Sequence, residues 1–314
     1  MIWQETQANK GVTLIELMIV LVIAAILVGG IYTLFATQQR SYFVQDRVAG
    51  IQQDARAVLT IMARDIRMAG LAVGVGGATG FTDGTTPFAI SGFNFAVNPT
   101  NSDSAPDSLT VVLGVNELGT VQSIAGTLVT LDNNVASDNT FVAFDLQPGR
   151  LYQATPDDTN VMPVTNFPGG DTTVGGKAYG VKAITYTVTA LDGTAGLGSL
   201  RRNENTGAGA QPLAGDGTTT FVEDLQFAYQ VEGDAGWYND PSTDFPAGTN
   251  QANIEMVRIS INVRTAVEDA TVADADAAAQ FDQPALEDHT TTGLNTDDGF
   301  RRRVYTTVVK VRNL

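Results

Sequence analysis

The stretch "NKGVTLIELMIVLVIAAILVGG", residues 9–30, is a long apolar run near the start of the chain that contains one charged side chain after Lys10. From Val12 to Ala36 the only side chain charged at neutral pH is Glu16. As an α-helix, a segment of this length would extend about 37 Å, which is enough to cross the hydrocarbon core of a bilayer. A carboxylate at that depth is costly and usually functional. The segment predicts a membrane anchor, in which Glu16 either is protonated or reaches the interface, or meets a positive partner inside an assembly.

This apolar segment differs from a secretory signal peptide. Signal peptides have a shorter apolar core that is followed by a cleavage site of small residues, whereas this run continues through Gly29 and Gly30 into Ile31. We therefore expect it to stay on the mature protein. Lys10 precedes the run and favours a cytoplasmic N-terminus, which predicts a body outside the cytoplasm.

The residues around the glutamate, Lys10-Gly11-Val12-Thr13-Leu14-Ile15-Glu16-Leu17, closely resemble the processing site of type IV prepilins and type II secretion pseudopilins. In that family a membrane-embedded prepilin peptidase cuts after the glycine and methylates the new amine. The resemblance implies cleavage between Gly11 and Val12, N-methylation of Val12, and pairing of Glu16 with the amine of a neighbouring subunit. Such a pair leaves neither charge desolvated and alone. Val12 stands where the family usually has Phe.

Helical periodicity continues beyond the apolar run. Apolar residues recur at intervals of three and four, which is typical of one face of an amphipathic helix; they are Val44, Val48, Ile51, Ala55, Val58, Met62 and Ile66. Gly70 is placed to end that helix. A single helix from Val12 to Ala69 would be about 87 Å long.

The end of this helix, "RDIRMAG" (residues 64–70), resembles the PilW-type minor pilins and the J-type pseudopilins, and the closing "RRRVYTTVVKVRNL" resembles the final strand of PilW-type proteins. Apart from the resemblance, we interpret Arg64, Asp65 and Arg67 as a solvated helix face with weak local pairing. Arg301–Arg303 open the final strand, where we expect local pairing or protection of a sheet edge. The Gly-rich passage 70–88 lacks a phosphate-loop pattern and predicts a flexible connector.

The remainder has the pattern of short β-strands separated by turn residues. Strands are predicted at 108–113, 127–131, 141–145, 150–154, 181–190, 197–203, 221–231, 256–264 and 303–311. "AITYTVTALDGTAGLGSLRR" predicts a hairpin. "VRISINV" places Val257, Ile259, Ile261 and Val263 on one face, suited to cover the amphipathic helix. An Ala- and Asp-rich segment between the last two strands predicts a long exposed loop.

Composition excludes several functions for the 314 residues. The net charge of −16 argues against nucleic-acid binding, and the lack of cysteine excludes disulfides and thiolate chemistry. The only histidine, His289, lies in the acidic segment, and no catalytic constellation is apparent. We expect no enzyme, no cofactor and no metal, because the acidic loops lack the spacing of a calcium site.

These patterns predict an α+β, pilin-like fold with a long N-terminal helix packed on an antiparallel sheet. The expected parts are a leader peptide (1–11), a transmembrane and filament-core half-helix (12–36), an amphipathic half-helix (37–70) and a β-rich extracytoplasmic head (71–314). The resemblance implies a minor pilin that helps to initiate or cap a type IV pilus at its tip. Its implied partners are prepilin peptidase, other minor and major pilins, the inner-membrane assembly platform and membrane lipid.

That assignment predicts an inner-membrane protein with a periplasmic head, which reaches the pilus or cell surface after assembly. Two alternatives stay open. A J-type minor pseudopilin of type II secretion would use the same mechanics in a different machine. A membrane-anchored adhesive or ligand-binding surface protein would make the motif a coincidence.

Overall fold

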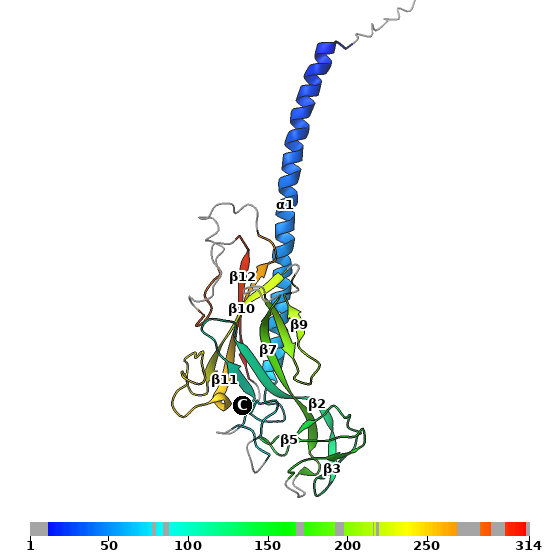
Figure 1. Cartoon of the computed structure of the whole chain (residues 1–314), viewed down its shortest axis with the longest axis vertical. Coiled ribbons are helices and arrows are strands. Elements are labelled where there is room, and N and C mark those ends of the chain that lie inside the picture. Colours follow the sequence, from blue (N-terminus) through cyan, green and yellow to red (C-terminus); the bar gives the residue numbers. More distant parts are fainter. Residues whose placement is uncertain are drawn as a thin grey trace, which may run out of the picture. The chain divides into compact units, whose positions relative to one another are not determined.

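The structure of the chain is a computed structural model. It describes residues 12–76, 80–83, 88–167, 173–191, 198–215, 217, 220–268, 283–289 and 299–311. The chain divides into two compact units, Met1–Val48 and Ala49–Leu314, and a single helix, α1 (Leu14–Arg67), contributes to both (Figure 1).

Helix α1 is the long helix that the periodicity predicts, and it ends slightly before the predicted stop. Its last turn carries Arg64 and Arg67, whose positive charges suit a helix C-terminus. The chain then turns at Gly70, where φ is +76° and the amide N donates to the carbonyl O of Val112. A Cβ on Gly70 would lie 2.8 Å from the carbonyl O of Gly74. Glycine is therefore needed at this turn.

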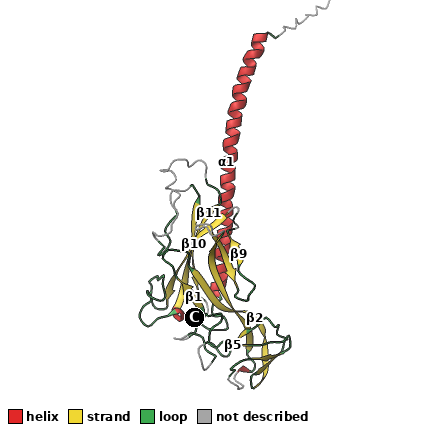
Figure 2. Cartoon of the chain, viewed as in Figure 1, coloured by secondary structure: helices red, strands yellow, loops and turns green. Residues whose placement is uncertain are grey.

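Figure 2 shows in yellow the strands that follow the helix. The described part of the chain has twelve, and every pairing between them is antiparallel. The main path through the sheet runs β12-β11-β10-β8-β7-β2-β3-β6. In chain order the strands are β1 (Val97–Thr100), β2 (Ser108–Ala125), β3 (Leu128–Leu131), β4 (Phe141–Phe144), β5 (Tyr152–Gln153), β6 (Val161–Pro163), β7 (Lys177–Ala190), β8 (Gly198–Asn203), β9 (Gln211–Ala214), β10 (Thr220–Val231), β11 (Ile254–Thr265) and β12 (Arg302–Lys310), with a short 3-10 helix η2 (Gln251–Asn253) before β11.

The main core lies between the sheet and the part of α1 from Ile51 onward. Its helical side chains include five of the seven that the spacing predicts, namely Ile51, Ala55, Val58, Met62 and Ile66, together with Ala63. The other two, Val44 and Val48, are only half-buried and lie outside this core. Its strand side chains include the alternating β11 residues Val257, Ile259, Ile261 and Val263, all fully buried. The apolar face of the helix and that of β11 thus pack in one core. The predicted α+β fold, with a long helix packed on an antiparallel sheet, is confirmed.

A second, smaller core forms a lobe at the far ends of β2 and β7. Strand β2 is long enough to serve both cores, because Leu109 lies in the first and Val121 in the second. Within the lobe, the rings of Phe144, Tyr152 and Phe167 pack at centroid distances of 5.2–5.9 Å. The sequence does not predict this separate core.

All nine predicted strands are present, and the predicted hairpin is the antiparallel pair β7–β8. Strands β1, β6 and β9 were not predicted, because each is short and contains a proline. The Gly-rich connector prediction is wrong where the structure describes the segment, because Val73 and Phe81 are fully buried. The amide N of Gly149 also donates to the carbonyl O of Val73. This passage packs into the core instead of linking two parts loosely.

Candidate assembly site

The first turn of α1 presents the predicted processing and assembly residues. Gly11 lies outside the described residues. Val12 and Glu16 are exposed, and Thr13 precedes the helix. The backbone N of Glu16 donates to Thr13 Oγ1 at 3.3 Å, while the backbone N of Thr13 donates to Glu16 Oε2 at 3.4 Å. This reciprocal arrangement is a capping box, which satisfies amides that a helix start leaves unpaired.

An uninterrupted apolar surface follows this turn. Each large apolar side chain from Val12 to Phe35 is more than half exposed. Among the described residues α1 is the one helix that is long and apolar enough to cross a membrane, with a mean hydropathy of 2.9 over its most apolar window. So large an exposed apolar area marks a surface for lipid or for other helices.

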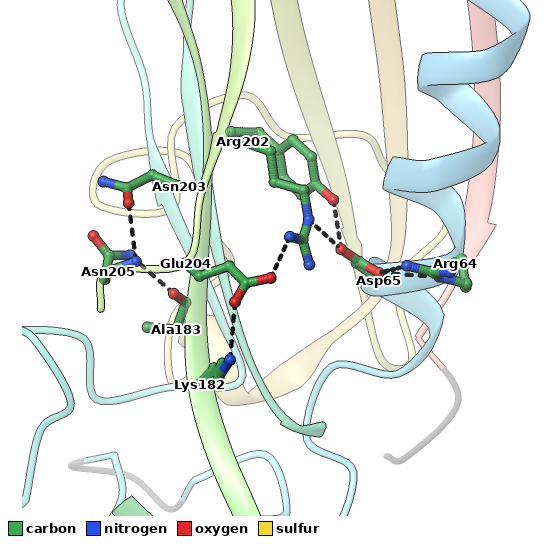
Figure 3. Close-up of polar contacts among 9 residues, drawn as sticks. Arg64, Asp65, Lys182, Ala183, Arg202, Asn203, Glu204 and Asn205 are labelled. Carbon is green, nitrogen blue, oxygen red and sulfur yellow. Dashed lines mark hydrogen bonds and ion pairs between the residues drawn. The ribbon is translucent and has the colours of Figure 1, made fainter. Parts of the chain in front are cut away.

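At the other end of α1, Asp65 connects the helix to the sheet (Figure 3). Its carboxylate is 1% exposed. Tyr186 Oη of β7 donates to Asp65 Oδ2 at 2.6 Å, and Arg202 Nε of β8 donates to the same oxygen at 3.0 Å. Arg64 Nη2 lies 3.2 Å from Asp65 Oδ1. The predicted solvated helix face is therefore wrong for Asp65, although Arg64 and Arg67 are exposed as expected.

The ion pairs continue from Arg202 across the sheet. Arg202 Nη1 donates to Glu204 Oε1 at 2.6 Å, and Lys182 Nζ donates to Glu204 Oε2 at 2.9 Å (Figure 3). The hydrogen bonds from Arg202 and Lys182 lower the pKa of Glu204. Burial works against the charge of Arg202, but its hydrogen bonds to Glu204 and Asp65 raise its pKa. Both groups are thus held in their charged forms.

This group of Asp65, Tyr186, Arg202, Glu204 and Lys182 is called the anchor cluster below. Burial, and then the hydrogen bond to Asp65, raise the pKa of Tyr186, so its hydroxyl stays protonated and continues to donate. A buried charge that loses its partner costs several kcal/mol. The anchor cluster therefore holds the last turns of α1 in one position against β7 and β8.

Two family models match the chain. Residues 6–32 match the prokaryotic N-terminal methylation motif, and residues 185–313 match type IV pilus-assembly protein W. The chain carries a PilW domain. With the methylation motif ahead of it, this confirms the resemblance to PilW-type minor pilins that the sequence predicts. Tyr186, Arg202 and Glu204 belong to this domain, whereas Asp65 and Lys182 lie outside it.

A type IV-like pilin from Thermus thermophilus is among the similar solved structures, with 12% identity and a TM-score of 0.36. That alignment covers 84% of this chain and 97% of the pilin. No curated protein sequence matches the chain.

The PilW domain contains a second buried charged group on β10, β11 and β12. Arg302 Nε and Nη2 donate to the two carboxylate oxygens of Glu223 at 2.6 and 2.8 Å. Arg264 Nε lies 3.0 Å from Glu223 Oε1, and its guanidinium lies over the ring of Phe300 at 3.8 Å. Arg302 thus pairs with a buried carboxylate of β10, and not locally at the sheet edge as predicted.

Residues 283–289 of the PilW domain correct the prediction of a long exposed loop. His289 is 3% exposed, and its Nδ1 lies 2.8 Å from Asp224 Oδ2. Glu287 accepts hydrogen bonds from Arg258 and Ser260 of β11. The rest of the predicted loop, at 269–282 and 290–298, lies outside the described residues. The described part is therefore a buried strap on the sheet.

The sequence did not predict the polar partners within the anchor cluster or around Glu223, but it contains one signal for Asp65. Asp65 falls three residues after Met62 and seven after Val58, which places it on the buried face of the helix. A carboxylate on that face needs a partner. Among the described residues, no group of three acidic, histidine or cysteine side chains is arranged to hold a metal ion.

Proposed function

We propose that this chain is a minor pilin of the type IV pilus that helps to initiate or cap assembly near the tip. The observation that carries the proposal is the joint occurrence of a methylation-motif segment, a fully exposed apolar half-helix and a PilW domain. The role is structural, and no step in it needs catalysis by this chain.

In this proposal, prepilin peptidase cuts between Gly11 and Val12 and methylates the Val12 amine. The apolar part of α1 first anchors the protein in the inner membrane, with the head in the periplasm, and then packs among the helices of other pilins. Lipid tails and neighbouring apolar helices offer similar environments, so apolar burial alone favours neither state. A polar interaction that exists only in the filament would favour assembly.

Glu16 supplies that interaction. In the free chain its carboxylate accepts only weak hydrogen bonds of 3.4 Å from Thr13. The methylated amine of a neighbouring pilin is a cation, so it adds a Coulombic attraction that the neutral Thr13 donors lack, and this attraction is stronger where water is excluded. Exchanging the capping contact for this pair favours the filament. The other partners in the proposal are major and minor pilins and the inner-membrane assembly platform.

The substitution Glu16→Gln tests this role because glutamine keeps the capping box and removes only the charge. We expect normal membrane insertion but at least a tenfold loss of the variant from sheared pili, measured by immunoblot against the unaltered chain. Gln53→Glu, which adds a charge at an exposed position of the same helix, is the matched control and should assemble normally. Normal incorporation of Glu16→Gln would contradict the proposed pairing.

Deleting the gene shows whether the protein belongs to a type IV pilus or to a type II secretion system. We expect loss of surface pili and of twitching motility, with secretion unaffected. Trapped exoproteins in cells with normal pili would instead assign the chain to a type II secretion system.

A further inference from the structure

The head contains a cavity of about 370 Å³ that the assembly proposal does not use. It is lined by residues 181–183 of β7, residues 204–206 after β8, loop residues 90, 91, 138 and 140, and Phe141 at the start of β4. Most of this lining lies outside the part of the chain that matches PilW. Figure 3 shows Lys182, Ala183, Glu204 and Asn205 on neighbouring segments at this place.

The wall of the cavity has both an apolar and a polar part. The apolar part comes from the ring of Phe141 and from residues 181 and 183 of β7, whose side chains belong to the main core. Hydroxyl groups come from Thr140 and Thr206. Small-molecule sites commonly combine an apolar lining with a few convergent polar groups, over a volume of about 300–1,000 Å³. The cavity lies near the small end of that range.

Two of the charged side chains in the wall, Lys182 and Glu204, already neutralise each other. Lys182 Nζ lies 2.9 Å from Glu204 Oε2, and the second oxygen of Glu204 is held by Arg202. An anion would have to break the Lys182–Glu204 pair and would face the exposed carboxylate of Asp138. A cation would have to compete with Lys182 and Arg202 for Glu204, or pair with the exposed carboxylate of Asp138, where a solvent-screened ion pair contributes little. The wall therefore favours a neutral ligand that both donates and accepts hydrogen bonds.

We propose that this cavity binds a neutral saccharide of one or two sugar rings. Sugar hydroxyls match the threonine hydroxyls, the side-chain oxygen of Asn205 and the fixed Lys182–Glu204 pair, and the C–H face of a sugar ring suits Phe141. Because Glu204 is held on both oxygens and Asn205 Nδ2 donates to the carbonyl O of Ala183, these polar groups are in position before a ligand enters. This site is separate from the assembly surface of α1, and it would give the head a recognition role.

The test uses the full chain in a detergent without a sugar headgroup, applied to a printed array of neutral and sialylated oligosaccharides. We expect binding to neutral glycans and at least a tenfold loss of binding in Thr206→Trp, which fills the cavity from an exposed position. Thr127→Trp is the matched control, because Thr127 is exposed and does not line the cavity.

Phe141→Leu is a second variant, which keeps the apolar volume and removes the ring. It should weaken binding several-fold in a titration with the best neutral glycan of the array. The proposal would be overturned if no glycan bound, if only sialylated glycans bound, or if Thr206→Trp and Thr127→Trp bound equally. None of these outcomes depends on pilus assembly, so the result stands apart from the test of Glu16.

Discussion

At the scale of single residues, Asp65 is the clearest case of a charged side chain whose environment differs from the one that the sequence predicts. In the sequence it looks like one of several charges on a helix, but in the structure it is buried between Tyr186 and Arg202. Its phase on the helix indicates burial, but no local pattern identifies its partners. They come from strands more than a hundred residues later in the chain, and only the folded sheet brings them to α1.

Removing this carboxylate should destabilise the protein strongly. Asp65→Ala leaves the half-buried Arg202 without its partner on α1, and breaking a buried pair from one side typically costs about 3 kcal/mol or more. We expect this loss in the free energy of unfolding, measured by chemical denaturation of the full chain in detergent. Asp46→Ala, at an exposed position of the same helix, should change it by less than about 0.5 kcal/mol. Equal effects of the two substitutions would show that the anchor cluster does not stabilise the fold.

At the scale of elements, α1 and the strands follow from periodicity. Intervals of three and four predict the buried face of the helix, and alternation predicts the inner face of β11. The lobe with the second core was not predicted, and neither were strands β1, β6 and β9, because each of these strands has only three or four residues and contains a proline, which argues against a strand. The strap at 283–289 also escaped prediction, since a polar composition predicts exposure unless the buried polar partners are known.

Two glycine substitutions, one at the turn after α1 and one within α1, should change the stability of the protein in opposite directions. Gly70→Ala should lower the melting temperature by several degrees, because φ is +76° and the new Cβ would meet the Gly74 carbonyl at 2.8 Å. Gly50→Ala should stabilise α1 by about 0.5–1 kcal/mol, because it lies within the helix and a Cβ there meets no atom within 4 Å. Differential scanning calorimetry of both variants checks the prediction. A neutral Gly70→Ala would show that the turn tolerates an L side chain.

At the scale of the whole molecule, buried carboxylates should make stability depend on pH. Burial raises the pKa of Asp107 to about 8, although the backbone N–H groups of Phe227 and Ser102 donate to it. Burial also raises the pKa values of Asp224 and Asp288. Between pH 4 and 8 the folded state keeps a proton on Asp107 that the unfolded chain has released. The contribution of Asp107 to stability is therefore greatest below pH 4 and is lost as the pH rises through 8.

We expect the free energy of unfolding to fall between pH 5 and 8 by up to about 1.4 kcal/mol per pH unit from Asp107 alone. Asp107→Asn should flatten this dependence in denaturation curves recorded at each pH. Asp46→Asn, an exposed control, should leave the slope as it is. An unchanged slope in Asp107→Asn would assign the pH dependence to other groups.

The assembly account depends most directly on the N-terminus of the mature chain. The full chain is expressed with and without a prepilin peptidase, purified from the membrane, and its N-terminal peptide is identified by mass spectrometry. With the peptidase, the account predicts a chain that begins at N-methylated Val12, and without it an uncut chain that begins at Met1. An uncut chain in both cases, or a cut at any bond other than Gly11–Val12, would contradict it.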